Sequence, residues 1–397
     1  MAVKRVAAEF VYTLDSIEPL RNGYVEYDDC DGTVLKVGAC ADGYSDEILK
    51  GAVVPGFVNS HCHVELSHLH KKFVKGTGMA GFIDQINSLR DWAGSDVKQK
   101  LVKEWMDRMW ERGVSAMADI SNDDSSFEVK KTHQMYTRTF LEVFGSEPEM
   151  CEGVMNDVAE LNSVAQKAGI DAAPTPHSCY TMSPELLSAS AAAALDAGFL
   201  SYHSQESQEE EDLLRSGSGA MYENRKRSGM STPPVTGESS LKYFLSRLAA
   251  VRPVPYDARV LLVHNVCLQQ DDIDAAKQVM KNIYWAVCPL SNQFIHNTLP
   301  PVPLMRANSL AITVGTDSLS SNDDLDMVAE LVCLHDSFPE VPMGEILQWA
   351  CLNGACFLSK EDVLGSIEPG KKPGLVFVSD IDENGFFTSG SRSARIV

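Results

Sequence analysis

AVVPGFVNSHCH, residues 52–63, is the stretch of sequence that decides the fold. It is an apolar run that ends in two histidines, His61 and His63, with one residue between them. Side chains two positions apart on a β-strand point to the same face, so both imidazoles can reach one metal ion. A single His-x-His pair is more often two ordinary polar residues at a strand end. The rest of the chain therefore has to decide between these two interpretations.

Further apolar runs follow the first one, and each ends in a polar or glycine-containing cluster. Together the eight runs occupy residues 52–61, 115–121, 138–145, 171–177, 198–207, 259–266, 283–292 and 310–318. They are too uniformly apolar to alternate, which is typical of strands buried on both faces. Helix-like stretches such as 98–113 and 183–198 lie between runs, and each ends at a glycine.

Strands that alternate with helices predict parallel βα units, and eight of them predict an α/β fold closed into a (β/α)8 TIM-like barrel. A doubly wound open sheet is the alternative, although no glycine-rich nucleotide fingerprint supports it. Residues 1–54 and 363–397 instead contain short strand-like pieces and Asn-Gly or Asp-Gly turns. We expect one small β-sandwich domain built from both termini, with the barrel spanning residues 55–362. The polar segment 205–238 is expected to be a long active-site loop.

The composition excludes several kinds of partner. The formal net charge of −21 disfavours nucleic acid and anionic membranes, which leaves a small-molecule substrate as the expected partner. The ten cysteines form no C-x-x-C motif, and Cys267 and Cys288 lie in apolar runs, as expected for reduced thiols. No stretch approaches the roughly 20 apolar residues that span a bilayer. These features predict a cytoplasmic protein, and apolar-rich barrels of this kind often form homodimers.

The carboxyl ends of the barrel strands are where catalytic groups project, so the ends of the runs test the barrel hypothesis. Five of the ten histidines lie there, together with acidic residues. The set comprises His61, His63, His177, His203, Glu206, His264 and Asp317. Imidazoles and carboxylates bind divalent metals and move protons. The sequence therefore predicts a metal site with an adjacent proton carrier.

Each residue also has a plainer interpretation. Glu206 follows His203 in an H-x-x-E unit that suits a general base, but it could share a solvated helix face with Glu209–Glu211. We expect the solvated face for residues 209–211 only. His264 could complete the metal shell, steady the attacking hydroxide, or be a hydrogen-bonded core residue. Asp317 could bind metal or cap the next helix.

Two other features of the sequence limit which histidines and how many metal ions we expect at the site. A second pair, His68 and His70, lies past the strand and is expected to face solvent or a substrate loop. The fourth run, DAAPTPH, contains no lysine, which could be carboxylated to bridge two ions in a barrel of this kind. One ion is therefore the expectation.

With these residues in hand, the chain resembles the amidohydrolase superfamily, in the branch of cytosine, guanine, S-adenosylhomocysteine and aminofutalosine deaminases and the triazine hydrolases. The resemblance spans the whole chain. Its motifs are PGFVNSHCH, HSCYTMSPEL, HSQE, VHNV, CPLSN and VGTDSLSSNDDLDM, followed by LNGACFL and GSIEPGKKPGLVFV. HCHVELS and the glycine-rich lead into a helix look closest to the aminofutalosine deaminase subgroup.

The resemblance implies that one divalent ion, zinc in the first place and iron(II) in the second, binds four residues, namely His61, His63, His203 and Asp317. It implies that Glu206 carries the proton and that His264 contacts the water and the tetrahedral centre. His177 would contact the substrate. Glu65 and the segment 75–87 are expected to line the pocket.

Hydrolytic deamination of an aminated heterocycle or purine nucleoside is the leading functional hypothesis. Glu206 would take a proton from the water and deliver it to a ring nitrogen, and Asp317 with Glu206 would help ammonia leave. Hydrolysis of an amide, imine or halogenated ring at the same site is the first alternative. A non-catalytic scaffold is the second, and it predicts gaps in the constellation that the sequence does not have.

Overall fold

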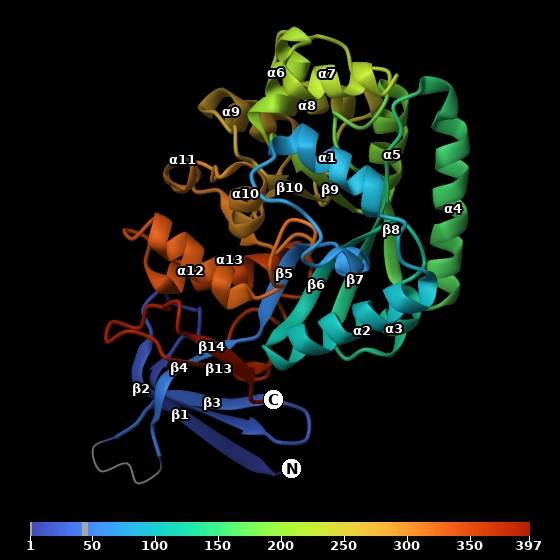
Figure 1. Cartoon of the computed structure of the whole chain (residues 1–397). Helices are drawn as coiled ribbons and strands as arrows, with labels where there is room; N and C mark the ends of the chain where they lie inside the picture. The colour runs from blue at the N-terminus through green and yellow to red at the C-terminus, as the bar shows by residue number, and fades with distance from the viewer. Residues whose placement is uncertain (1, 42–46) are drawn as a thin grey trace.

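A computed structural model of the chain describes residues 2–41 and 47–397. Two parts stand out in Figure 1, a sheet that contains both ends of the chain and a larger barrel with surrounding helices. The sheet has the order β14-β13-β4-β1-β2-β3. Its strands are β1 (Val3–Val11), β2 (Leu20–Asp28), β3 (Val34–Ala39), β4 (Leu49–Pro55), β13 (Leu375–Ser379) and β14 (Arg392–Arg395).

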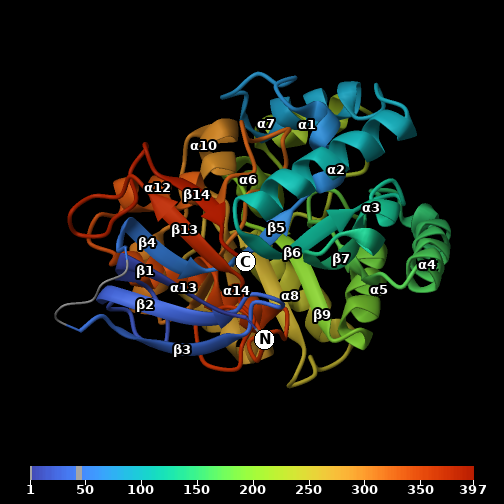
Figure 2. The same cartoon turned by 90° about the horizontal axis from the view of Figure 1, so that it is seen from below.

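This terminal sheet brings the two ends of the chain together as expected from the sequence. β13 pairs antiparallel with β4, so the last part of the chain extends a sheet begun by the first part. Figure 2 shows these strands side by side from below. The six strands are hydrogen-bonded as one continuous sheet rather than as two separate sheets. The division into residues 1–54 with 363–397 and 55–362 remains a proposal.

The eight runs form the eight barrel strands, in two parallel four-stranded sheets. The first sheet contains β5 (Phe57–Cys62), β6 (Val114–Ser121), β7 (Tyr136–Val143) and β8 (Asp171–Pro176). The second contains β9 (Phe199–Ser204), β10 (Arg259–His264), β11 (Asn282–Val287) and β12 (Ala311–Val314). The first run, residues 52–61, was expected to form one strand, but it forms parts of two. The chain leaves the terminal sheet at Gly56, so the run contributes to β4 before that residue and to β5 after it. A Cβ at Gly56 would collide with Ser115 and Pro373, so the two parts approach closely there.

The two half-barrels meet at their carboxyl ends through residues of the predicted site. At one seam the backbone N–H of His203 donates to the carbonyl of His177 over 2.9 Å. At the other seam the N–H groups of Thr316 and Asp317 donate to the carbonyl of His61 over 3.1 and 3.0 Å. The barrel is thus closed by the same segments that carry the polar side chains.

Helices cover the outside of the barrel and its two ends. The helices that follow the individual strands of the first half-barrel are η1 (Val64–Leu69), α1 (Gly78–Leu89), α2 (Ser95–Glu111), α3 (Phe127–Thr132), η2 (Pro148–Met150), α4 (Cys151–Lys167) and α5 (Pro184–Asp196). After the second come α6 (Gln208–Ser216), α7 (Gly219–Arg227), α8 (Ser240–Val251), α9 (Gln270–Val279), α10 (Pro289–His296), α11 (Val302–Ala307), α12 (Met327–Ser337), α13 (Met343–Ala350) and α14 (Leu352–Phe357). Among the described residues, no helix is both long and apolar enough to cross a bilayer.

The amino-terminal end of the barrel is filled by apolar side chains. Phe357 of α14 is fully buried and stacks on Phe140, with the ring centroids 5.9 Å apart. It also contacts the rings of Phe199 and Tyr284, which lie near the starts of β9 and β11. Because this end is packed, the barrel interior is closed there, and a site in the barrel is expected at the carboxyl end.

Candidate active site

His61 and His63 are the first pair at the carboxyl end of the barrel. His61 lies in β5 with no exposed surface, and His63 directly follows the strand and is 7% exposed. Their Nε2 atoms lie 3.2 Å apart, and Oδ1 of Asp317 lies 3.8 and 3.7 Å from them. The two-residue spacing therefore brings both imidazoles together, and Asp317, which follows β12, adds a carboxylate beside them.

His203 adds a third imidazole to this point. One ring nitrogen from each of His61, His63 and His203 lies within 4.8 Å of the others. Burial lowers the pKa of all three imidazoles, so they are neutral at physiological pH. Neutral imidazole nitrogens are the form that binds metal. The donor set, three imidazoles and a carboxylate, fits a single divalent ion.

Asp317 presents one oxygen to the histidines and binds its neighbours with the other. Oδ2 accepts hydrogen bonds from the hydroxyls of Ser291 and Ser321 over 2.6 and 3.0 Å. Burial opposes ionisation of Asp317, but its pKa is lowered to about 2, because the carboxylate attracts the protonated forms of His63, His264 and His61 and accepts the hydrogen bond from Ser291. The aspartate is therefore a carboxylate with a fixed orientation, and Oδ1 is left facing the imidazoles.

Glu206 and His264 lie beside the three histidines. Oε1 of Glu206 is 3.3 Å from Nε2 of His264, and Oε2 accepts a hydrogen bond from the Tyr180 hydroxyl over 2.6 Å. Burial raises the pKa of Glu206 to about 8, although the bond from Tyr180 acts in the opposite direction. A buried carboxyl whose pKa lies near neutral can both take and give a proton.

The second ring nitrogen of His264, Nδ1, is oriented by a neighbouring side chain. Nδ1 lies 3.2 Å from Nδ2 of Asn292, the asparagine of the CPLSN segment at the start of α10. Burial lowers the pKa of His264 to about 4, so its imidazole is neutral. The backbone is also constrained, because His264 has a φ of 75° in the left-handed region. Nε2 is thereby directed at Glu206 and the metal-binding cluster.

The pocket beside this cluster has one apolar wall. It is formed mainly by α1 with help from α7 and the segment after it, and its apolar side chains include Met79, Phe82, Ile83, Ile86, Met221 and Met230. The segment 75–87 lines the pocket through α1, as expected. Segment 205–238 forms two helices rather than one loop, and it reaches the pocket through Glu206, α7 and Met230. Two aromatic side chains, Phe82 and Tyr180, also line the pocket.

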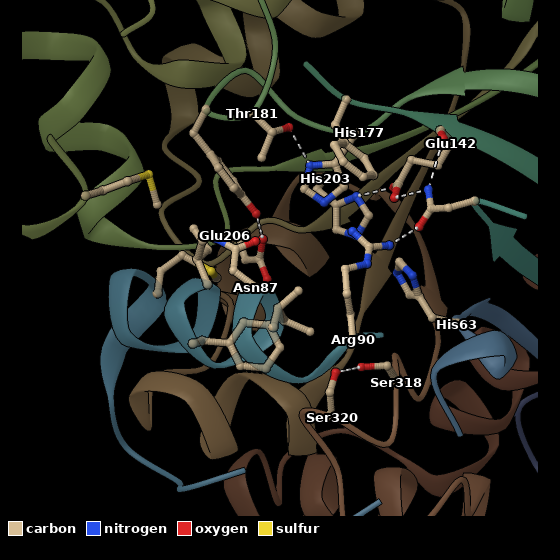
Figure 3. Close-up of a pocket in the computed structure, with 18 of the residues that line it drawn as sticks. His63, Asn87, Arg90, Glu142, His177, Thr181, His203, Glu206, Ser318 and Ser320 are labelled. Carbon is tan, nitrogen blue, oxygen red and sulfur yellow. Dashed lines mark hydrogen bonds and ion pairs between the residues drawn. The ribbon is translucent and has the colours of Figure 1, made fainter. Parts of the chain in front are cut away.

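Figure 3 shows the polar side of the pocket, with His63, His177, His203 and Glu206 around a common space. The ring of His177 stacks on His203 with the centroids 4.4 Å apart. Its Nδ1 lies 2.8 Å from the Thr181 hydroxyl oxygen. This arrangement suits the predicted substrate contact.

Glu65 is placed differently from the other predicted residues. Its Oε2 atom accepts hydrogen bonds from the backbone N–H groups of Asn122 and Asp123 over 2.8 and 3.4 Å. It is 4% exposed and is not among the residues that line the pocket, whereas Asn122 is. Burial raises the pKa of Glu65 to about 8. In this conformation the side chain supports the pocket wall through the backbone of residue 122.

Two expectations about exposure were wrong. His68 is 2% exposed, because its ring nitrogens lie 3.1 and 2.8 Å from the backbone carbonyl oxygens of Glu65 and Arg90. Of residues 209–211, Glu210 and Glu211 are buried rather than solvated. Glu210 accepts hydrogen bonds from the backbone of residues 205 and 206, which compensates for its burial.

Glu142 is a site residue that the sequence reasoning missed. It lies near the end of β7, lines the pocket, and has Oε1 3.4 Å from Nδ1 of His203. Burial raises its pKa well above the ordinary value. The signal was present, because a glutamate near the end of the apolar run 138–145 is as unusual as a histidine there. Arg90 and Arg225 also line the pocket and lie in segments without a strand-end signal.

The close approach of Gly315 to His61 leads to the first prediction. A Cβ at position 315 would lie 2.7 Å from the carbonyl oxygen of His61 and 2.8 Å from its nitrogen. Gly315→Ala should therefore displace β5 or the segment after β12 and lower the free energy of unfolding by about 1–3 kcal/mol. The metal content should fall with it. Urea unfolding and metal analysis of the purified variant measure both quantities.

Gly153 in α4 provides the control, because a Cβ there would have no atom within 4 Å. Gly153→Ala should leave the metal content unchanged and stabilise the helix by up to about 1 kcal/mol. A Gly315→Ala protein with wild-type stability and metal content would show that the contact is not needed.

The arrangement is that of a metal-dependent hydrolase, because a divalent ion and an adjacent proton carrier are what activate water for attack. Residues 52–395 match the Amidohydrolase family, and the chain belongs to that family. The recognised resemblance is thereby confirmed. The metal-binding group found by geometry agrees with a family of metal-dependent enzymes.

Relatives with established names agree with this assignment. A 5-methylthioadenosine/S-adenosylhomocysteine deaminase from Syntrophomonas wolfei is 26% identical over 388 residues, covering 91% of this chain and 81% of that protein. An adenosine deaminase from Helicobacter pylori is 25% identical over 331 residues, covering 81% of this chain and 78% of that protein.

Solved structures confirm the fold. The crystal structure of Helicobacter pylori aminofutalosine deaminase in complex with methylthio-coformycin has a TM-score of 0.78 at 21% identity, covering 96% of this chain and 93% of that chain. Guanine deaminase from C. acetobutylicum has a TM-score of 0.69 at 15% identity, covering 95% of this chain and 91% of that chain. The α/β barrel expected from the eight runs is therefore the fold of this chain.

Proposed function

We propose that the protein is a hydrolytic deaminase of a purine nucleoside, with one zinc ion held by His61, His63, His203 and Asp317. The main support for this proposal is the placement of Glu206. It is a buried carboxyl with a pKa near neutral, and it lies beside three neutral imidazoles and a carboxylate. The relatives named as adenosine-type deaminases support the same activity. Iron(II) fits the same donors less closely than zinc, for which tetrahedral nitrogen and oxygen sites are typical.

The residues divide the work of the reaction between them. When bound, the ion lowers the pKa of a coordinated water towards neutral. Glu206 takes a proton through Oε1 and delivers it to the ring nitrogen next to the amine-bearing carbon, so that hydroxide can add to that carbon. His264, neutral and 3.3 Å from Glu206, stabilises the developing tetrahedral centre. Glu206 and Asp317 then assist the departure of ammonia.

Substrate recognition falls to the other walls of the pocket. His177 is positioned to bond the heterocycle, since its ring lies against His203 at the inner end. The apolar side chains of α1, among them Phe82 and Ile86, form a surface suited to an apolar group attached to the sugar. We therefore expect 5′-substituted adenosines to be better substrates than a free base. Glu65 would act on substrate only if its side chain rotated away from Asn122.

Ammonia release across a substrate panel tests this proposal. The panel comprises 5′-methylthioadenosine, S-adenosylhomocysteine, aminofutalosine, adenosine, adenine, guanine and cytosine, with a chlorinated triazine and a simple amide as the alternative chemistry. We expect kcat/KM to be at least about tenfold higher for a 5′-substituted nucleoside than for adenine, since burying a few methylene-sized groups contributes about 1.5–3 kcal/mol.

Three results would overturn parts of the proposal. Preference for the triazine or the amide would favour the alternative hydrolase. Absence of turnover on every compound, together with absence of a stoichiometric divalent ion, would favour a non-catalytic scaffold. Preference for a free base would keep the deaminase and remove the nucleoside.

A homodimer and a cytoplasmic location complete the proposal. The charge of −21 disfavours anionic polymers as partners.

A further inference from the structure

Tyr180 is a pocket residue whose hydroxyl is committed to Glu206. It is 3% exposed, and it donates to Oε2 of the glutamate over 2.6 Å. The other oxygen, Oε1, lies 3.3 Å from Nε2 of His264. The two oxygens of one carboxylate are thus distinguished, because Oε2 is occupied by a hydroxyl donor and Oε1 faces the cluster.

Tyr180 is itself held firmly in place. Its backbone carbonyl accepts a hydrogen bond from the guanidinium of Arg225, which is buried and also bonds the carbonyl of Ser231. The phenol ring meets His177 edge to face, with the ring centroids 5.6 Å apart. The hydroxyl therefore cannot follow Glu206 freely if that side chain rotates.

A second contact fixes the main chain of Glu206. Its backbone N–H donates to Oε2 of Glu210 over 2.7 Å, and the N–H of Gln205 donates to Oε1 over 3.2 Å. The Cys179 thiol donates to the same Oε1 over 3.4 Å. Gln205 has a φ of 49°, a left-handed conformation that a side chain other than glycine adopts only when neighbours hold it. Residues 179–180 thus restrain residues 205–206 in two ways, directly through the Tyr180 hydroxyl and indirectly through the Glu210 carboxylate that Cys179 also contacts.

We propose that Tyr180 is the positioning residue of the proton carrier: its hydroxyl anchors Oε2 of Glu206, so that Oε1 alone exchanges protons with water and substrate. Glu210 supports this geometry from the main-chain side. The inference rests on the proposed role of Glu206 in the deaminase reaction. It also links substrate contact to proton transfer, because His177 and Tyr180 belong to one short segment.

Tyr180→Phe tests the inference, since it removes one oxygen atom and keeps the ring. Hydrogen bonds to charged groups contribute about 1.5–3 kcal/mol, so kcat should fall about tenfold to a hundredfold. KM and the stoichiometric metal content should stay within about twofold of wild type. Tyr243→Phe is the matched control, because the Tyr243 hydroxyl is buried in α8 with no hydrogen-bond partner among the described residues. Its kcat should be unchanged.

A double-mutant cycle then shows whether Tyr180 acts through Glu206. Adding Tyr180→Phe to Glu206→Gln should cause no further loss of kcat, because the anchored carboxylate is already gone. A wild-type kcat for Tyr180→Phe would overturn the inference, and so would a full additive loss in the double variant, which would place the phenol on the substrate. A near-wild-type Glu206→Gln protein would instead overturn the proposed function itself.

Discussion

Glu206→Gln should lower kcat by about a hundredfold or more while the protein keeps its metal ion, in line with the usual contribution of a general base. The amide has nearly the shape of the carboxyl, so Tyr180 and His264 keep neighbours of the same size. It cannot, however, take a proton from water and deliver it to a ring nitrogen. The loss therefore belongs to proton transfer rather than to binding. Ammonia release and metal analysis on the same preparation measure the two quantities.

The control for this variant is Glu104→Gln on α2, where the glutamate is exposed and pairs only with Lys100 among the described residues. It should behave as wild type in both measurements. If Glu206→Gln turned over substrate at nearly the normal rate with its ion retained, another group would have to carry the proton. If it lost the ion, Glu206 would be a ligand instead.

His61→Ala should remove the metal ion and reduce turnover by roughly 10³-fold or more. Metal activation of water contributes several kcal/mol to the transition state, and each 1.36 kcal/mol corresponds to about tenfold in rate. His61 is fully buried, and its Nε2 atom lies 3.2 Å from that of His63 and 3.8 Å from Oδ1 of Asp317. No neighbouring side chain can substitute for it at that point. Metal content after gel filtration and the rate with saturating zinc check the prediction.

His133→Asn is the control for histidine loss, since His133 lies 3.5 Å from Asp107 outside the pocket lining. It should keep both the ion and the activity. A His61→Ala protein that still bound one equivalent of zinc would move the metal site elsewhere in the chain.

Much of this site could be predicted from the sequence because a barrel brings the ends of successive strands close together in space. The carboxyl ends of parallel strands meet at one face, so a histidine or carboxylate at the end of each apolar run must lie near the others. His61, His203 and Asp317 come from three distant runs, yet His61 clusters with His203 and has Oδ1 of Asp317 3.8 Å from its Nε2 atom. The eight runs also favoured a barrel over a doubly wound open sheet.

The rest could not be predicted because it depends on which backbone groups come within reach. Glu210 resembles its neighbours in a run of acidic residues, and only the fold shows that the N–H groups of residues 205 and 206 point at it. His68 is buried for the same reason, since carbonyl oxygens from residues 65 and 90 surround its ring. Local polarity gives no information about such partners. Glu142 differs, because its place in an apolar run is visible in the sequence.

A metal ion at this site would also have a structural effect, because its proposed ligands come from both half-barrels. His61 and His63 belong to the first half, and His203 and Asp317 belong to the second. An ion held by all four is a cross-link across both halves, joining positions more than 250 residues apart in the chain. Such a link stabilises the native state by an amount that grows with the logarithm of the free metal concentration relative to its Kd, and it restrains separation of the halves. The metal-free barrel would then unfold more readily than the metal-loaded one, although backbone hydrogen bonds already join the halves at both seams.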